Sequence, residues 1–358
     1  MKRIVQLIDS LDVGGAERMA INYANALLKE TGFSGLVATR REGGLKDQIN
    51  PGVAYLSLER KKTIDFNAAV RLKQFCKDHA VDYLQPHSSS YFTALMVKLI
   101  HPKISIIWHD HNGLSEFLSS RKSIALKVGS LFFKGIVVVN YQLKNWAQRE
   151  LNCKHVIYLP NFTDFQNHTI AETLLKGNPG KRILCLANLR DQKNHFLLIR
   201  VASLLKNNHP DWTFHLVGKD FNDDYSERLH AAIEAAQLQE TVFLYGSRTD
   251  SGAIIDQADI AIMTSKSEGL PVALLEYGLY KKPVVVTGVG EIPLIVKNGT
   301  NGFLVASDDE KSFHTALTDL IEDKTLQLQF GEALFHTIAT NHTETAIIKQ
   351  YLNWLETL

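Results

Sequence analysis

Short apolar runs alternate with helical segments along this chain, and this alternation limits its fold more than any other feature. The runs contain no regular change between apolar and polar residues, which is typical of parallel strands covered on both faces. Strands that alternate with helices predict an α/β fold with doubly wound parallel sheets. The expected strands are Ile4 to Ile8, Leu36 to Thr39, Tyr83 to Leu84, Ile104 to Trp108, Ile136 to Val139, Ile183 to Ala187, Thr213 to Val217, Val242 to Leu244, Ile260 to Met263 and Val284 to Thr287.

The alternation breaks once, in a polar stretch between Pro160 and Lys181 that is rich in Asn, Asp, Gly and Pro. This break predicts a linker at 165–180 between an N-terminal Rossmann-like domain, 1–164, and a C-terminal one, 181–339. A length of 358 residues suits two domains of roughly 150 residues each. Ligands of such sheets bind outside the carboxyl ends of the strands, so a cleft between two sheets is the expected site.

Composition excludes several classes of protein. The 39 basic and 38 acidic residues give a net charge of +1, which predicts no nucleic-acid partner. The 3 cysteines lie far apart, which excludes a disulfide framework and a zinc ribbon. The apolar stretch after Met1, Lys2 and Arg3 is short for a signal peptide, and no window reaches the roughly 18 apolar residues of a membrane span. We therefore expect a soluble, cytoplasmic protein.

The most informative stretch is Ser265 to Val286, where a strand leads into an apolar helix. Pro271 suits the first helical turn, and Gly269 allows a ligand to approach the backbone closely. The free N–H groups there, those of Gly269 and Leu270 among them, attract phosphate. Glu268 and Glu276 flank this position and suit sugar hydroxyl groups. The plainer alternative is that Glu268 caps the helix and Glu276 is solvated.

Two cations, Arg190 and Lys193, follow the strand Ile183 to Ala187. At a strand end they suit a diphosphate, which in other proteins is neutralised by a divalent metal. The chain has no Asp-x-Asp pair, the usual mark of a Mg²⁺ or Mn²⁺ site for a nucleotide diphosphate. The alternative is a solvated basic loop.

The first half offers two further candidate sites. Gly14 and Gly15 follow the first strand and open a helix, but they fit neither the dinucleotide-binding nor the P-loop pattern. They suit close approach of a ligand, or a simple tight turn. His109 and His111 follow the strand Ile104 to Trp108 and, with His87, suggest a metal hydrolase, although no downstream Asp or His completes a ligand set.

Taken together, these motifs resemble the retaining glycosyltransferases of family 4 (glycosyl transferases group 1), which have the two-Rossmann GT-B fold. The Glu-x7-Glu motif is present as Glu268 and Glu276. The other matching segments run nearly the whole length of the chain: Arg190 with Lys193, Val217-Gly218 with Asp220, Phe243 to Gly246, Gly290 to Pro293 and Asn298 to Val305. Two positions depart from the family pattern, Glu291 in place of a second glycine and Leu294 in place of an acidic residue.

The resemblance implies a role for each matching residue. Arg190 and Lys193 would hold the donor diphosphate, Glu268 the transferred sugar and Glu276 the ribose. Gly218 and Tyr245 would line the donor site, with Tyr245 near the base, and the Gly14-Gly15 loop would reach the phosphates. His109 would lie beside the transferred sugar, with His111 as the fallback, and a pKa near ~6.5 would let it donate to a hydroxyl.

The expected function is therefore metal-independent, retaining transfer of a sugar from a nucleotide diphosphate, UDP favoured over GDP, to a glycan or lipid-linked saccharide. Cell-surface polysaccharide synthesis is the expected setting. The alternatives are a nucleotide-sugar epimerase or hydrolase, and a non-catalytic nucleotide-sugar binding module.

Two further segments suggest contacts, one with a membrane surface and one between the C-terminus and the first domain. Segment 119–134 reads as a helix with basic and apolar faces, suited either to an anionic membrane surface at the inner face of the plasma membrane or to core packing. Apolar residues at helical spacing recur near the C-terminus. The family resemblance implies that a helix at about 340–358 returns to the first domain.

Overall fold

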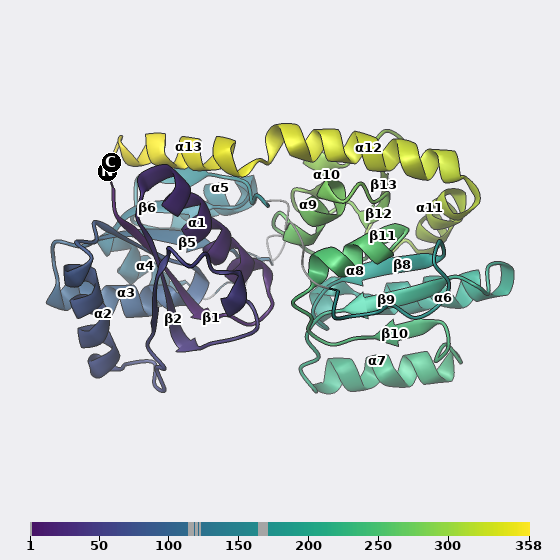
Figure 1. Cartoon of the computed structure of the whole chain (residues 1–358), viewed down its shortest axis with the longest axis horizontal. Coiled ribbons are helices and arrows are strands. Elements are labelled where there is room, and N and C mark those ends of the chain that lie inside the picture. The colour runs from purple at the N-terminus through teal and green to yellow at the C-terminus, as the bar shows by residue number, and fades with distance from the viewer. Residues whose placement is uncertain (1, 114–117, 119–120, 122, 164–170) are drawn as a thin grey trace. The chain divides into compact units, whose positions relative to one another are not determined.

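The computed structural model describes residues 2–113, 118, 121, 123–163 and 171–358. Contacts divide the chain into two compact units, Met1–Asp164 with Thr343–Leu358, and Phe165–His342. Each unit contains one parallel β-sheet flanked by helices (Figure 1). The prediction of two doubly wound α/β units is confirmed.

The first unit has a seven-stranded sheet in the order β3-β2-β1-β4-β5-β6-β7. Its strands are β1 (Ile4–Ser10), β2 (Ser34–Arg41), β3 (Ala54–Ser57), β4 (Tyr83–Pro86), β5 (Ser105–Asp110), β6 (Phe133–Val138) and β7 (Val156–Tyr158). Its helices are α1 (Gly15–Thr31), α2 (Phe66–Asp78), α3 (Tyr91–Ile100), α4 (Ile124–Gly129), α5 (Tyr141–Glu150) and α13 (Glu344–Leu355). Chain order reverses between β1 and β4, which makes this pair the topological switch point of the sheet.

Helix α13 belongs to the first unit although it lies near the end of the chain. Its apolar stripe is buried in that unit, and Thr343 caps it by accepting from the Ala346 N–H. The Trp354 ring packs directly over Gly135 in β6, where a Cβ atom would collide with it. A glycine in the strand therefore makes room for the helix. Figure 1 shows α13, in yellow, beside α1, in purple.

The second unit has a six-stranded sheet in the order β10-β9-β8-β11-β12-β13. Its strands are β8 (Arg182–Leu186), β9 (Thr213–Val217), β10 (Val242–Leu244), β11 (Ile260–Met263), β12 (Val284–Thr287) and β13 (Phe303–Val305). Its helices are α6 (His195–Asn208), α7 (Asp224–Ala235), α8 (Ser251–Gln257), α9 (Val272–Leu279), α10 (Ile292–Ile295), α11 (Glu310–Glu322) and α12 (Lys324–Asn341). Here the switch point lies between β8 and β11.

The described part of the expected linker, residues 171–180, is bonded to the second unit. The backbone N–H groups of Glu172 and Thr173 donate to Asp250 Oδ2 at 2.9 and 2.7 Å. The Leu175 N–H donates to Gln257 Oε1 at 3.0 Å. Polar composition marked this stretch as a linker, but three of its backbone N–H groups donate to side chains of α8 and of the residue before it. Residues 165–170 lie outside the described part.

Segment 119–134 is not one helix. Its described residues contain α4, the 3₁₀ turn Ser130–Phe132 and the start of β6 at Phe133. Residues 119, 120 and 122 are outside the described residues. Leu126 and Phe133 are buried, whereas Ile124, Val128, Leu131 and Phe132 are exposed. The expectation of a single amphipathic helix is therefore wrong, because the strand takes the last residues of the segment.

Candidate functional site

The predicted donor-site residues lie in loops at one edge of the second sheet, where its strands end. Arg190 and Lys193 follow β8, Gly218 follows β9, and Tyr245 follows β10. Glu268, Gly269 and Leu270 follow β11, and Glu276 lies in α9. Since β8 and β11 are neighbours at the switch point, the cations and Glu268 lie where parallel sheets of this kind bind ligands.

Lys193 and Glu268 form an ion pair across this switch point. The Lys193 Nζ lies 2.6 Å from Glu268 Oε1, with side-chain exposures of 19% and 5%. Ser265 Oγ donates to the same carboxylate oxygen at 2.6 Å. Thr264 Oγ1 donates to the Lys193 carbonyl at 2.9 Å, which ties the two loops together. The cation is therefore held in place by residues from both strand ends, in surroundings that weaken charge interactions less than water does.

Arg190 is held by an aromatic side chain. It precedes the 3₁₀ turn Asp191–Lys193, and its guanidinium carbon lies 4.4 Å from the centroid of the Phe221 ring. Such a cation–π contact fixes the direction of the guanidinium group without using its N–H donors. Phe221 and Ser265 thus orient the predicted cation and carboxylate, and the sequence analysis gave a role to neither of them.

The structure settles the plainer alternatives for the two glutamates. Helix α9 begins at Val272, and its N-cap is Pro271, which makes no side-chain capping bond. Pro271 thus lies one position before the expected first turn. Glu268 bonds to Lys193 and Ser265, so it does not cap this helix. Glu276 is 9% exposed, so it is not a solvated surface side chain.

Two glycines at this edge are required by close backbone contacts. A Cβ atom at Gly218 would collide with the backbone of Ala187 and Asn188, at the end of β8. Gly290 has a φ of +57°, and a Cβ there would collide with the Glu268 carbonyl. The loop after β12 therefore packs tightly under the loop that carries Glu268.

Tyr245 has its hydroxyl group engaged within the second unit. The Lys176 N–H donates to this hydroxyl at 2.9 Å, and His215 Nδ1 lies 2.9 Å from it. Burial raises the pKa of Tyr245. The hydroxyl thus ties residues 171–180 to the sheet, so any contact of this residue with a nucleotide base would come from the ring.

In the first unit, Gly14 is the N-cap of α1 and Gly15 is its first residue, at the end of the loop that follows β1. His109 is 1% exposed near the end of β5. Burial lowers the pKa of His109 well below its usual value, and burial lowers that of His111 to about 3. The expected pKa near ~6.5 for His109 is therefore wrong, and both imidazoles are neutral at pH 7.

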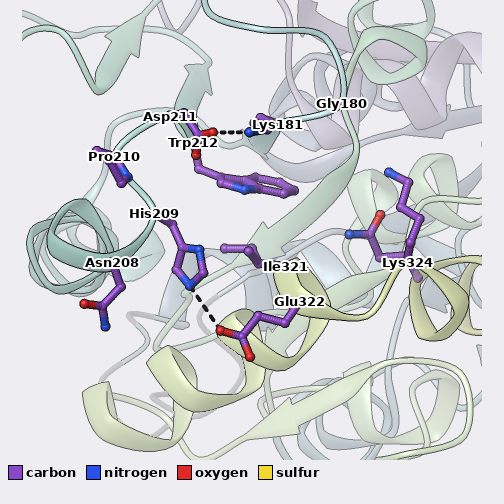
Figure 2. A pocket seen from close by; sticks show the side chains of 11 residues that line it. Gly180, Lys181, Asn208, His209, Pro210, Asp211, Trp212, Ile321, Glu322 and Lys324 are labelled. Carbon is purple, nitrogen blue, oxygen red and sulfur yellow. Dashed lines mark hydrogen bonds and ion pairs between the residues drawn. The ribbon is translucent and has the colours of Figure 1, made fainter.

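A hollow of about 700 Å³ in the second unit lies at the opposite edge of the sheet (Figure 2). Lys181 precedes β8, and residues 209–212 precede β9, so the hollow lies at the amino ends of these strands. Figure 2 shows the ion pair Lys181–Asp211 and the contact of His209 with Glu322 among the residues that line it. None of the predicted donor-site residues lines this hollow.

The fold and the clusters at the strand ends define a two-part α/β protein of the GT-B type. The family "Glycosyl transferases group 1" matches residues 166–336, and the family "Glycosyltransferase Family 4" matches residues 13–167. The two matches are contiguous and together span most of the chain. The chain belongs to the group 1 glycosyltransferases.

Individual relatives agree with this assignment. An uncharacterised glycosyltransferase of Haemophilus influenzae is 23% identical over 93% of this chain and 94% of its own length. The UDP-Gal:α-D-GlcNAc-diphosphoundecaprenol α-1,3-galactosyltransferase of Escherichia coli is 24% identical over 90% of this chain and 88% of its own. Anabaena HepE, solved with UDP and glucose, has a TM-score of 0.81 at 18% identity and full coverage of both chains. No helix among the described residues has the length and apolar character needed to span a membrane.

Proposed function

We propose that this protein is a retaining, metal-independent hexosyltransferase that moves a sugar from a UDP-sugar to a glycan or lipid-linked acceptor. The observation that carries the proposal is the Lys193–Glu268 pair at the switch point between β8 and β11. A cation and a carboxylate held 2.6 Å apart offer one partner for a diphosphate and one for the hydroxyls of the attached sugar.

The donor is bound by the edge of the second sheet. Arg190 and Lys193 hold the diphosphate, with the backbone N–H groups of Gly269 and Leu270. Glu268 contacts the transferred sugar, and Glu276 binds the ribose. Gly218 and the ring of Tyr245 line the nucleotide site. UDP is favoured over GDP because the Escherichia coli relative is named for a UDP-sugar and HepE was solved with UDP and with UDP-glucose.

Fixed cations and backbone amides stabilise the negative charge that develops on the diphosphate as the glycosyl bond breaks. The departing phosphate accepts the proton of the acceptor hydroxyl, so no protein base is needed. His109, a neutral imidazole, offers a hydrogen bond beside the sugar. The Gly14-Gly15 loop contributes backbone N–H groups to the phosphates.

The acceptor is a glycan or a lipid-linked saccharide of cell-surface polysaccharide synthesis. The name of the Escherichia coli relative specifies a diphosphoundecaprenol acceptor, and other relatives are named for amylovoran and lipopolysaccharide core synthesis. Action in the cytoplasm, at the inner face of the plasma membrane, would bring the enzyme to such an acceptor. The exposed apolar side chains of α4 and of the turn after it, with exposed Lys127 among them, suit that surface.

Lys193→Ala tests the central element of this proposal. Loss of a cation that stabilises the leaving diphosphate should lower kcat by about 10²- to 10³-fold. The matched control is Lys281→Ala, because Lys281 also pairs with a glutamate, Glu332, but lies before β12 at the other edge of the sheet. Near-normal turnover in Lys193→Ala would refute the assignment.

Two further measurements separate the alternatives. Calorimetric titration with UDP and with GDP identifies the base and shows whether the site binds a nucleotide diphosphate. Product analysis with and without an acceptor separates transfer from hydrolysis or epimerisation, and a binding module would give no product at all. Turnover that needs an added divalent metal would contradict the role given to Arg190 and Lys193.

A further inference from the structure

Three histidines of the first unit lie together at the carboxyl ends of two neighbouring strands. His87 directly follows β4, His109 lies in β5 and His111 follows it. A parallel bridge joins His87 to His109, which fixes the two strand ends side by side. One ring nitrogen from each of the three lies within 4.8 Å of the other two. His87 and His109 are buried and His111 is half-buried.

Side chains behind the rings fix their orientation. Gln6 Oε1, from β1, lies 2.8 Å from His87 Nε2. The Gln85 amide nitrogen lies 3.1 Å from His109 Nδ1. His87 Nδ1 lies 2.8 Å from His111 Nε2. Gln6 Oε1 accepts from His87 Nε2–H and leaves the lone pair of His87 Nδ1 to face an ion, as the acceptor behind a metal-binding histidine usually does. The Gln85 amide nitrogen instead donates to His109 Nδ1, so an ion at His109 Nε2 requires the Gln85 amide to turn its oxygen toward Nδ1.

One nitrogen of this group lacks a partner. Among the described residues, His109 Nε2 is buried without a hydrogen bond. A buried polar atom in that state destabilises the folded chain unless something binds it. A neutral imidazole has one lone pair, through which it binds a metal ion. Neutral imidazoles suit zinc, copper or nickel, whereas magnesium and calcium prefer oxygen ligands.

The spacing suits such an ion. Tetrahedral zinc with Zn–N bonds of about 2.0–2.1 Å places its ligand nitrogens ~3.3 Å apart. His87 Nδ1 and His111 Nε2 lie 2.8 Å apart, and the three ligand nitrogens all lie within 4.8 Å of one another, so the rings need to shift to give three equal separations of that size. Three histidines leave the fourth position of the ion to water.

We propose that His87, His109 and His111 bind one divalent transition-metal ion of the zinc type, with Gln6 and Gln85 orienting the rings. This inference rests on the geometry of the first unit and not on the proposed function. A consequence does depend on the proposed function: because His109 is assigned to the sugar, the bound ion would inhibit transfer and would not support it.

Binding is tested on the full-length chain after treatment with EDTA. Titration with Co²⁺, followed by its visible absorption, and with Zn²⁺, followed by calorimetry, should each reach one equivalent per chain. His111→Ala, at the half-buried position, should weaken binding by more than about 100-fold. His155→Ala is the control, because His155 is exposed in the same unit. Failure of the unaltered chain to bind either ion, or equal binding by the two variants, would overturn the proposal.

A separate activity measurement keeps the two proposals apart. Equimolar Zn²⁺ should lower the transfer rate of the unaltered protein, and the ratio of rates with and without Zn²⁺ should move toward one in His111→Ala. If Zn²⁺ binds with one equivalent per chain but does not inhibit, the metal site is supported and the assignment of His109 to the transferred sugar is contradicted. Inhibition that persists unchanged in His111→Ala would show that the ion acts elsewhere and would contradict an inhibitory role for these histidines.

Discussion

The Tyr351 hydroxyl of α13 donates to Gln85 Oε1 at the end of β4, at a distance of 2.6 Å. Tyr351 is fully buried, and the same Gln85 side chain contacts His109 Nδ1 at 3.1 Å. A residue near the end of the chain is therefore one side chain away from the histidine assigned to the sugar. Helix α13 holds the switch point of the first sheet in place as well as covering that sheet.

Tyr351→Phe should lower the free energy of unfolding by about 1–2 kcal/mol, because it removes a buried donor from the Gln85 carbonyl oxygen. Denaturant unfolding measures this loss. Tyr23→Phe is the matched control: its ring centroid lies 5.5 Å from that of Tyr351, and its hydroxyl is buried without a partner among the described residues. That variant should be neutral or more stable. Equal losses in the two variants would show that the Tyr351–Gln85 bond contributes nothing.

Gly290→Ala should destabilise the second unit and disturb Glu268. The substitution combines a positive φ of +57° with a collision between the new Cβ and the Glu268 carbonyl. Gly299→Ala is the control, since its φ is +71° but no atom lies within 4 Å of its Cβ position. We expect the free energy of unfolding to fall by about 1 kcal/mol in the control and by about 2–4 kcal/mol in Gly290→Ala. Thermal unfolding measures both, and equal values would exclude the contact with Glu268.

Glu276→Gln should weaken UDP binding by roughly 10-fold or more, since a charge-assisted hydrogen bond contributes about 1.5–3 kcal/mol. Calorimetry with UDP and with 2′,3′-dideoxy-UDP tests the partner. If Glu276 accepts from the ribose hydroxyls, the variant should bind the two nucleotides almost equally. If Glu276→Gln still prefers UDP over 2′,3′-dideoxy-UDP as strongly as the unaltered protein does, Glu276 does not bind the ribose hydroxyls. Glu332→Gln, an exposed change on α12, is the control.

Leu131→Glu should reduce binding to anionic vesicles, because Leu131 is 65% exposed in the apolar surface of α4 and its following turn. Leu328→Glu introduces the same charge at a leucine that is 67% exposed on α12. Vesicle flotation compares the two variants on anionic and on zwitterionic lipid. If the unaltered protein binds neither lipid, the proposed membrane association is wrong.

Buried strands were the part of the fold that the sequence predicted best. Thr213–Val217 and Ile260–Met263 were expected with the bounds that the structure has, because central parallel strands are apolar on both faces. The strands β3, β7 and β13 were missed. All three lie at sheet edges, have only three or four residues and are partly exposed, so each apolar run is too short to indicate a strand.

The site was predictable only where residues sit at strand ends. Arg190, Lys193 and Glu268 share one edge because β8 and β11 are neighbours, which follows from the strand order. Their partners did not follow from sequence, since Phe221 and Ser265 carry no chemical mark of their own. The three histidines were seen in the sequence, but their convergence depends on the pairing of β4 with β5 and on Gln6 and Gln85, which are inconspicuous in a strand.

The packing of Trp354 on Gly135 has a consequence for the folding of the chain during its translation. The ribosome makes β6 long before α13, and the whole of Phe165–His342 is translated between them. The unit that starts first is thus the last to be completed, and its sheet stays uncovered beside β6 while the second unit can already fold on its own residues. We expect this uncovered face to be the surface that chaperones meet on the nascent chain.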